Sequence, residues 1–311
     1  MTIREIFKKI KCGHKEYDTS LKKYTTYKTD TIARLIVSPR NVDDLKLIIK
    51  TIKKNNLNYM ILGNGSNLIF TNDIYEGVLI KLNKFDQMQI VGTRVIVGAG
   101  YNLVKLSMQV ANESLTGLEF ASGIPGTVGG AVYMNAGAYK SDMGYIVESV
   151  KVLTPDLEIK TMMNRELNYH YRSSFFQKNK DYIILEATIS LKRGTKEAIL
   201  AVIKDRRDRR IASQPLEYPN AGSVFRNPEN DFAGRLIEEA GLKGASVNDA
   251  YVSEKHANFI INKGNAKGKD IKALIEKIKK EIQEKYNVDL KVEQEIIEEE
   301  KIKVNLKETK L

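Results

Sequence analysis

The chain has 311 residues, 42% of them hydrophobic and 29% charged, a composition typical of a folded globular protein of two or three domains. No segment approaches the ~20 apolar residues of a membrane span. The N-terminal MTIREIFKKIKC lacks the apolar stretch of a secretion signal. A single cysteine, Cys12, excludes an intramolecular disulfide and a cysteine-ligated metal cluster. We therefore expect a cytoplasmic protein without a metal site, in which any redox chemistry requires an organic cofactor.

The net charge is +11, from 50 basic and 39 acidic residues. Such an excess suits a nucleic-acid-binding module or an enzyme whose ligands carry phosphates and carboxylates. A third explanation is a lysine-rich composition that affects only solubility, because lysines are spread over the whole chain. Net charge alone leaves these alternatives open.

The predicted elements begin with a helix that starts at Val42. Asp43 and Asp44 lie in its first turn, where the helix dipole favours negative charge. The charged segment 294–311 is expected to be a frayed or solvated tail. Between these two points, apolar patterns predict strands at 59–62, 68–70, 78–80 and within 85–100, a helix at 103–110, strands at 146–153 and 182–191, and helices at 196–212, 231–240 and 269–286.

Two glycine-bearing segments are the most unusual features of the sequence. Residues 63–67 (GNGSN) follow a predicted strand, and residues 123–139 contain five glycines and no charge. Glycine allows another group to approach the main chain, and successive free N–H groups bind phosphate. Neither segment is a P-loop or a Rossmann fingerprint, and a tight structural corner is the alternative for each. Two such turns in one half of the chain favour a large dinucleotide held by backbone donors.

Polar candidates follow in the second half of the chain. Arg172 has a planar guanidinium that suits a carboxylate or an enolate, although a surface salt bridge is the commoner role. Ser223 follows a glycine in a turn-rich segment but not in a Gly-x-Ser-x-Gly motif, which disfavours a Ser-His-Asp hydrolase. The arginine run within 206–210 is typical of a solvated helix face, and a diphosphate clamp is its functional alternative.

Six stretches then form an ordered set that resembles the UDP-N-acetylenolpyruvoylglucosamine reductases, the MurB family of flavoenzymes in peptidoglycan precursor synthesis. The set extends across most of the chain. Only 50 residues separate Arg172 from Ser223, so the sequence is similar to the short form without the tyrosine-bearing insertion. The stretches are LGNGSNLIF (62–70), GLEFASGIPGTVGGAVYMNAGAY (117–139), YRSSFF (171–176), QP…NAGSVFRNP (214–228), AGRLIEEAGLKG (233–244) and VSEKHANFI (252–260).

This resemblance implies an α+β fold with a two-part FAD-binding domain of the vanillyl-alcohol-oxidase (PCMH) type and a C-terminal α/β substrate-binding domain. Residues 1–84 would form the first FAD-binding part, with 290–311 returning to it. Residues 85–195 would form the second part and 196–289 the substrate domain. The resemblance also implies a monomer that binds neither nucleic acid nor a membrane.

The implied reaction is the NADPH-dependent reduction of UDP-N-acetylglucosamine enolpyruvate to UDP-N-acetylmuramate through non-covalently bound FAD. NADPH and the substrate would use one site in turn, and hydride would pass from reduced flavin N5 to the enolpyruvyl group. Arg172 matches the family arginine that stabilises enolate-like charge, and Ser223 matches the proton donor. Glu293 matches an assisting C-terminal glutamate, with Glu295 as the competitor if the register slips.

The resemblance also implies the binding residues. Substrate contacts fall on Tyr139, Gln214 and Asn227. Two alternatives remain at this point: another flavin-dependent oxidoreductase of the same fold that acts on an alcohol or hydroxy acid, and a basic nucleotide- or nucleic-acid-binding module without catalysis. The implied cofactor-binding residues are Gly63, Asn64, Gly65, Ser66, Asn67, Gly123, Ile124, Pro125, Gly126, Thr127, Gly129, Gly130 and Gly137.

Overall fold

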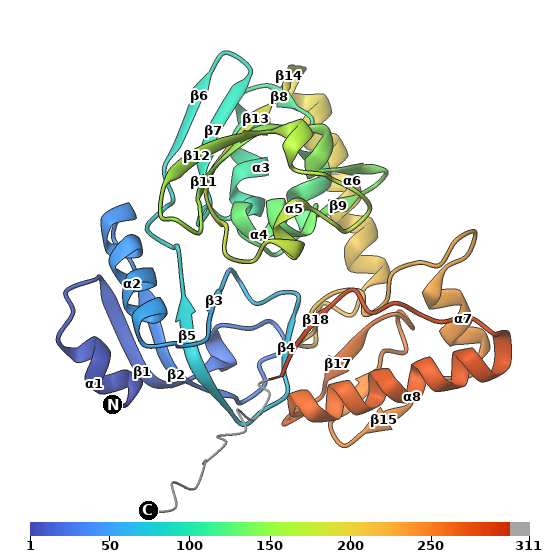
Figure 1. The fold of residues 1–311 in the computed structure, drawn as a ribbon. Helices are drawn as coiled ribbons and strands as arrows, with labels where there is room; N and C mark the ends of the chain where they lie inside the picture. Colours follow the sequence, from blue (N-terminus) through green and yellow to red (C-terminus); the bar gives the residue numbers. More distant parts are fainter. Residues whose placement is uncertain (299–311) are drawn as a thin grey trace, which may run out of the picture.

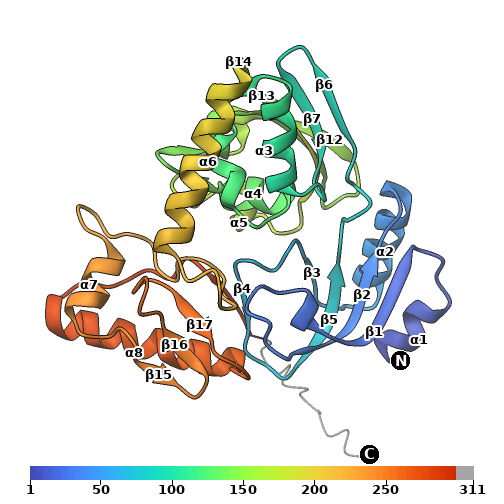
Figure 2. The same cartoon turned by 180° about the vertical axis from the view of Figure 1, so that it is seen from behind.

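The computed structural model describes residues 1–298, which fold around three main sheets of four, five and three strands. Figure 1 shows these sheets in the blue-to-cyan, teal-to-yellow and orange parts of the ribbon, and Figure 2 shows the same three parts from behind. None of the helices within residues 1–298 is long and apolar enough to cross a membrane.

The first sheet has the strand order β1-β2-β5-β3. Strand β1 is antiparallel to β2, whereas β5 is parallel to both β2 and β3. Helix α2 begins where expected because the Asn41 side chain accepts a hydrogen bond from the Asp44 N–H, and its apolar stripe is buried. The elements of this part are α1 (Ile3–Lys8), β1 (His14–Ser20), η1 (Leu21–Lys23), β2 (Ile32–Ser38), α2 (Val42–Lys54), β3 (Tyr59–Ile61), β4 (Leu68–Phe70) and β5 (Ile74–Ile80).

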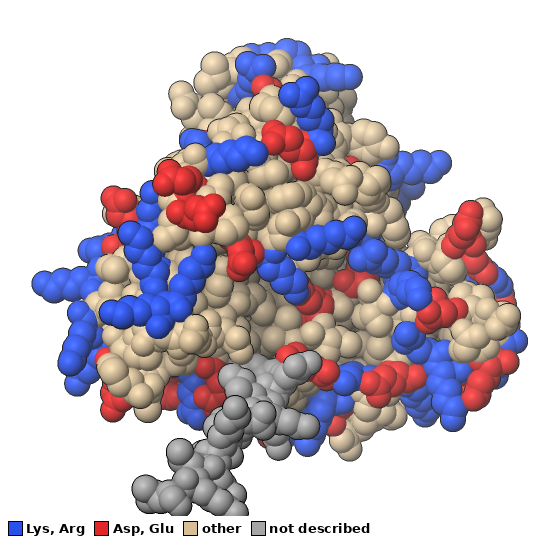
Figure 3. Space-filling model, viewed as in Figure 1, with Lys and Arg blue, Asp and Glu red and all other residues tan. Residues whose placement is uncertain are grey.

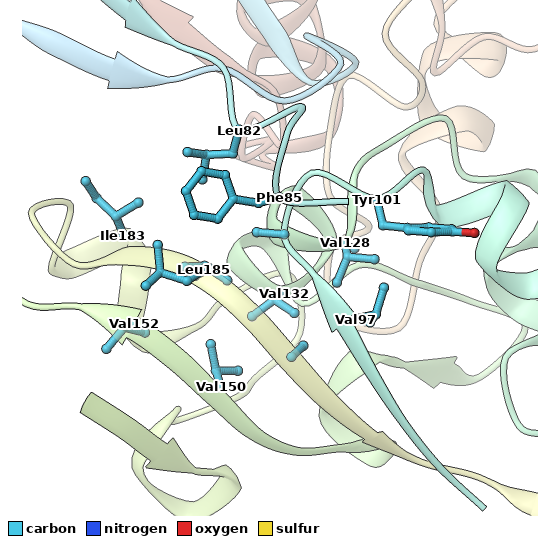
Figure 4. Close-up of a cluster of buried hydrophobic side chains, with 14 of the residues drawn as sticks. Leu82, Phe85, Val97, Tyr101, Val128, Val132, Val150, Val152, Ile183 and Leu185 are labelled. Carbon is cyan, nitrogen blue, oxygen red and sulfur yellow. The ribbon is translucent and has the colours of Figure 1, made fainter. Parts of the chain in front are cut away.

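The second sheet is antiparallel throughout, with the order β12-β11-β13-β7-β6. Figure 4 shows Val97 of β7, Val150 of β11 and Leu185 of β13 gathered around Val128 and Val132 of α4. This core fixes α4 and the glycine-rich loop before it. The larger elements are β6 (Met88–Val91), β7 (Arg94–Gly98), α3 (Leu103–Asn112), α4 (Val128–Met134), β11 (Val147–Leu153), β12 (Ile159–Met163), α5 (Phe175–Lys178) and β13 (Ile183–Ser190).

Short elements complete this second part. Two-residue strands form the pairs β8–β14 and β9–β10, and single turns of 3-10 helix lie between the longer elements. They are β8 (Leu115–Thr116), η2 (Glu119–Gly123), β9 (Gly137–Ala138), β10 (Ser141–Asp142), η3 (Met143–Tyr145), η4 (Asn164–Glu166) and β14 (Lys192–Arg193).

Helix α6 (Lys196–Ser213) leads from the second part to the C-terminal part, as both ribbon views show. Helix α8 (Gly268–Tyr286) covers the C-terminal sheet and buries the predicted isoleucine and leucine stripe from Ile271 to Ile282. The other elements here are α7 (Ala233–Glu239), β15 (Ser246–Val247), β16 (Ala250–Val252) and β17 (Ile260–Asn262).

The expected tail contains a strand, which corrects one prediction. Residues Glu295–Ile297 form β18, which pairs in parallel with β4 of the first part. Two polar residues in 294–297 hid this strand. Glu295 forms an ion pair with Lys180, and the buried Gln294 accepts a hydrogen bond from the Tyr27 hydroxyl. The rest of the predicted tail, 299–311, lies outside the described residues.

Figure 3 shows how the charged side chains are distributed over one face of the molecule. On this face, lysine and arginine side chains occur on all sides of the surface, with acidic side chains among them. A nucleic-acid-binding protein gathers basic residues on one face or along one helix. The visible face therefore favours the solubility explanation of the net charge.

Candidate active site

A cavity of about 600 Å³ lies between the three parts of the chain. Ligand pockets for small molecules and cofactors commonly hold roughly 300–1,000 Å³. Its walls come from the β3–β4 loop, the loop before α4 with α4 itself, the turn before α5, the segment after α6, and the residues beside β18. Both glycine-bearing segments and the three proposed catalytic residues, Arg172, Ser223 and Glu293, line this one cavity.

The GNGSN loop is shaped by its surroundings. Gly65 has a φ of +60°, and a Cβ there would lie 2.3 Å from the Tyr24 carbonyl oxygen, so only glycine fits. The Lys81 ammonium donates to the Gly63 carbonyl at 3.0 Å, and burial lowers the pKa of Lys81. Within residues 1–298, Asn64 and Ser66 make no hydrogen bond. The contacts of Gly63 and Gly65 thus hold the loop in place, while the side chains of Asn64 and Ser66 stay available to a ligand.

The glycines of the second segment have different functions. A Cβ on Gly126 would meet no atom within 4 Å, so this residue presents open backbone. Gly129 lets α4 approach Ala99 closely, because a Cβ on residue 129 would lie only 3.0 Å from the Ala99 Cβ. Gly123 is not in the cavity wall, because the Arg210 side chain covers it. The other predicted cofactor contacts all line the cavity: Asn67, Ile124, Pro125, Thr127, Gly130 and Gly137.

Arg172 lies in a tight turn in which His170 and Ser173 exchange backbone hydrogen bonds of 3.0 Å. Its φ is +53°, an uncommon conformation for a residue other than glycine. The Gln177 side chain and the Arg226 guanidinium hold the turn by donating to the Arg172 carbonyl at 3.1 and 3.2 Å. Neither supporting residue was predicted, because each lies outside the turn in the sequence.

The Arg172 guanidinium is aligned by two acceptors. Its Nε donates to Oε1 of Glu293 at 2.8 Å, and its Nη2 donates to the Gly137 carbonyl at 2.7 Å. These bonds use two of the five N–H groups of an arginine. The other three remain for a ligand, so the ion pair orients the fork without saturating it.

The Ser223 turn is built around a buried amide. Gly222 has a φ of +76°, and the Gln294 Nε2 donates to the carbonyls of Ala221, Gly222 and Ser223 at 3.1 to 3.4 Å. The Tyr27 hydroxyl donates in turn to the Gln294 Oε1 at 3.0 Å. Within residues 1–298 no side chain or carbonyl accepts from the Ser223 hydroxyl, which leaves its proton available at the cavity.

The two candidate glutamates have different partners. Glu293 pairs with Arg172, and its backbone N–H donates to the Val224 carbonyl at 2.8 Å, next to Ser223. Glu295 instead forms an ion pair of 2.7 Å with Lys180. Both carboxylates line the cavity, but only Glu293 is joined to both the arginine and the serine turn.

Only one of the three predicted substrate contacts lies at the cavity. Gln214 lines the cavity, whereas Tyr139 and Asn227 do not. The Tyr139 hydroxyl donates to the Arg206 carbonyl at 3.1 Å, and the Asn227 Oδ1 accepts from the Ala233 N–H at the start of α7.

Within residues 1–298, no cluster of three His, Cys, Asp or Glu side chains could hold a metal ion.

Comparison with known proteins assigns the chain to a family. It is 43% identical to UDP-N-acetylenolpyruvoylglucosamine reductase of Anoxybacillus flavithermus over 296 residues, which are 95% of this chain and 98% of that protein. The Bacillus subtilis enzyme of the same name is 43% identical over 278 residues, 89% of this chain and 92% of that one. The chain belongs to the UDP-N-acetylenolpyruvoylglucosamine reductase family.

Structure and family matches agree with this assignment. The crystal structure of UDP-N-acetylenolpyruvylglucosamine reductase (MurB) from Thermus caldophilus has a TM-score of 0.78 and 34% identity, and covers 91% of this chain and 98% of that one. Residues 33–162 match a family described as an FAD binding domain. Residues 214–297 match the C-terminal domain of UDP-N-acetylenolpyruvoylglucosamine reductase. The expected fold class, an FAD-binding domain followed by a substrate domain, is confirmed.

Proposed function

We propose that this chain uses NADPH to reduce UDP-N-acetylglucosamine enolpyruvate, with NADPH and the substrate occupying one site in turn. Family membership makes the chain a flavin-dependent oxidoreductase of peptidoglycan synthesis, whose reaction is also named UDP-N-acetylmuramate dehydrogenase. Cell shape and cell division are the processes that this product serves. The observation that carries the proposal is the convergence of Arg172, Ser223 and Glu293 on the cavity lined by both glycine-bearing segments.

The lining of the cavity fits FAD. Uncharged backbone at Gly65 and Gly126, with the unpaired groups of Asn64 and Ser66, suits a dinucleotide held without covalent attachment. The wall of the cavity contains no histidine or cysteine among its described residues. Bound FAD would supply the hydride chemistry; orientation and proton transfer belong to the protein.

Arg172 would bind the enolpyruvyl carboxylate. Its three uncommitted N–H groups can donate to the carboxylate oxygens on which negative charge develops, and Glu293 with Gly137 keeps the guanidinium in place before the substrate arrives. A donor set that needs no rearrangement stabilises developing charge most effectively. Glu293 also balances the guanidinium, which is only partly exposed.

Ser223 would then donate its proton to the carbon left with excess negative charge. A hydroxyl is a weak acid, so the donation requires a strongly basic acceptor and close positioning. Gln294 supplies that positioning, because it holds the carbonyls on both sides of the serine. Gln214 remains the proposed substrate contact on the cavity wall, and Tyr139 and Asn227 would approach only a substrate that extends beyond it.

The three-part domain division is also a proposal, with boundaries at 84, 195 and 289. It is supported by the three sheets and by the return of β18 to β4. A cytoplasmic location is supported by the nucleotide-linked substrate and the single cysteine. We propose a monomer, because the cavity is formed by residues of one chain.

One experiment tests the reaction. The absorbance spectrum of the purified full chain should show bound flavin, which NADPH bleaches under anaerobic conditions and UDP-N-acetylglucosamine enolpyruvate restores. NADH, tested in parallel, determines the nucleotide preference. A flavin that NADPH reduces but the enolpyruvyl sugar nucleotide fails to reoxidise would overturn the proposed function.

A further inference from the structure

Arg210 is an arginine of the cavity wall that the proposed mechanism does not use. It lies near the end of α6, and its side chain packs over Gly123. A Cβ on Gly123 would be 2.7 Å from Nη1 and 3.0 Å from Cδ of Arg210. Glycine at position 123 therefore makes room for this side chain. The sequence alone suggested instead that Gly123 contacts the cofactor directly.

Arg210 has no counter-charge in the described chain. Within residues 1–298 no carboxylate or carbonyl lies within bonding distance of its guanidinium, whereas its neighbour Arg209 pairs with Asp205 at 3.0 Å. Burial lowers the pKa of the Arg210 guanidinium, with Tyr139 nearby as a weaker opposing influence. A guanidinium taken out of water without a partner is unfavourable. Its charge and donors are therefore suited to an anion that enters the cavity.

A second unpartnered group lies beside it. Gln214 is four residues further along the chain, immediately after α6, and lines the same cavity. Its Oε1 is buried and has no hydrogen-bond partner. Most buried polar groups of folded proteins are paired. The cavity wall here thus offers two kinds of unused group: the guanidinium N–H donors of Arg210 and the amide acceptor of Gln214.

We propose that Arg210 forms a subsite for the phosphate oxygens of a bound dinucleotide or sugar nucleotide, and that the unpaired Oε1 of Gln214 beside it accepts from a hydroxyl of the same ligand. The inference rests on the proposed function only for the identity of these ligands. A planar fork binds phosphate oxygens in pairs, and Arg172 already provides the free donors that a carboxylate requires. The diphosphate belongs either to FAD or to the UDP-sugar, and these two sources are separable by experiment.

The test compares Arg210→Met with Arg209→Met, which removes the same charge from an exposed and paired side chain. FAD affinity is measured by flavin fluorescence on the cofactor-free full chain, and UDP affinity by calorimetry on the FAD-loaded chain. Loss of a charge-assisted contact predicts a weakening of about 10- to 100-fold for Arg210→Met and less than about twofold for Arg209→Met. Weakened FAD binding assigns the subsite to the cofactor, and weakened UDP binding assigns it to the substrate.

Gly123→Ala tests the same subsite without removing the charge, because a Cβ there displaces the flexible end of Arg210. It should weaken the same ligand, and the double variant should be no weaker than Arg210→Met alone. Unchanged affinities for FAD and UDP in both variants would overturn the proposal. Inorganic pyrophosphate, titrated into the cofactor-free chain, tests the Arg210 subsite separately from the proposed reaction. Binding that depends on Arg210 supports the subsite even if the enolpyruvyl sugar nucleotide fails as a substrate, and binding that is independent of Arg210 counts against it.

Discussion

Arg172 and Glu293 are 121 residues apart in the sequence, yet Nε of the arginine lies 2.8 Å from Oε1 of the glutamate. The turn that carries Arg172 belongs to the second part of the chain, and Glu293 follows the C-terminal part. Their ion pair therefore joins two parts of the chain at the wall of the cavity. The same glutamate is tied to the Ser223 turn through the Val224 carbonyl. Glu293 thus sets the relative position of the two groups on which the proposed chemistry depends, through its carboxylate on one side and its backbone N–H on the other.

This arrangement predicts different consequences for the two neighbouring glutamates. Glu293→Gln removes the negative partner of Arg172 and should slow reoxidation of the reduced flavin by the enolpyruvyl substrate by about 10²-fold. Glu295→Gln removes only the ion pair with Lys180, whose side chain is exposed. It should slow the same reoxidation step by less than about tenfold. Anaerobic stopped-flow absorbance measures both rates. The reverse order of effects would mean that Glu295 holds the catalytic position.

Ser223→Ala should separate the two half-reactions. The serine is proposed to act only after hydride has reached the substrate, so NADPH should reduce the flavin at nearly the normal rate. Turnover of the enolpyruvyl substrate should fall by more than the ~10²-fold expected of a general acid. The two rates are compared in the same preparation, which serves as its own control for folding. Equal losses in both half-reactions would remove Ser223 from the role of proton donor.

Two glycines predict opposite effects of the same substitution. Gly126→Ala places a methyl group in open space at the cavity, so the free energy of unfolding should change little while FAD affinity falls roughly tenfold or more. Gly268→Ala places a Cβ 1.8 Å from the Phe70 carbonyl oxygen, where α8 meets β4, and should destabilise the fold by at least about 1–3 kcal/mol. Urea unfolding and flavin fluorescence measure the two quantities. Normal FAD affinity in Gly126→Ala would show that the ligand does not approach this loop.

His256 predicts a dependence of stability on pH. Burial lowers its pKa below the ordinary value of 6.5, and its Nδ1 accepts the Asn258 N–H at 3.2 Å, which requires an unprotonated nitrogen. The unfolded chain therefore binds more protons near and below pH 6.5, so this contribution to stability is lost as pH falls through 6.5 towards the folded-state pKa. The free energy of unfolding should fall more between pH 7.5 and 5.5 in the parent than in His256→Gln. Parallel pH profiles would contradict this role.

The residue pattern by itself determined the local structure and the family. The stripes of α2 and α8 were readable because helical spacing repeats every few residues, and burial of one face then follows from composition alone. The two glycine-bearing segments were also recognisable, since their composition reflects local backbone demands. The ordered motifs led to the reductase family, which the comparisons confirm.

The site needed the tertiary structure, because its contacts join residues that no local periodicity relates. The pairing of Glu293 rather than Glu295 with Arg172 depends on where β18 meets β4. The covering of Gly123 by Arg210 depends on the path of α6. Strand β18 itself was missed, because Glu295 and the adjacent Gln294 find their partners in distant parts of the chain. Spacing records which residues share a face of one element, and only packing decides which faces meet.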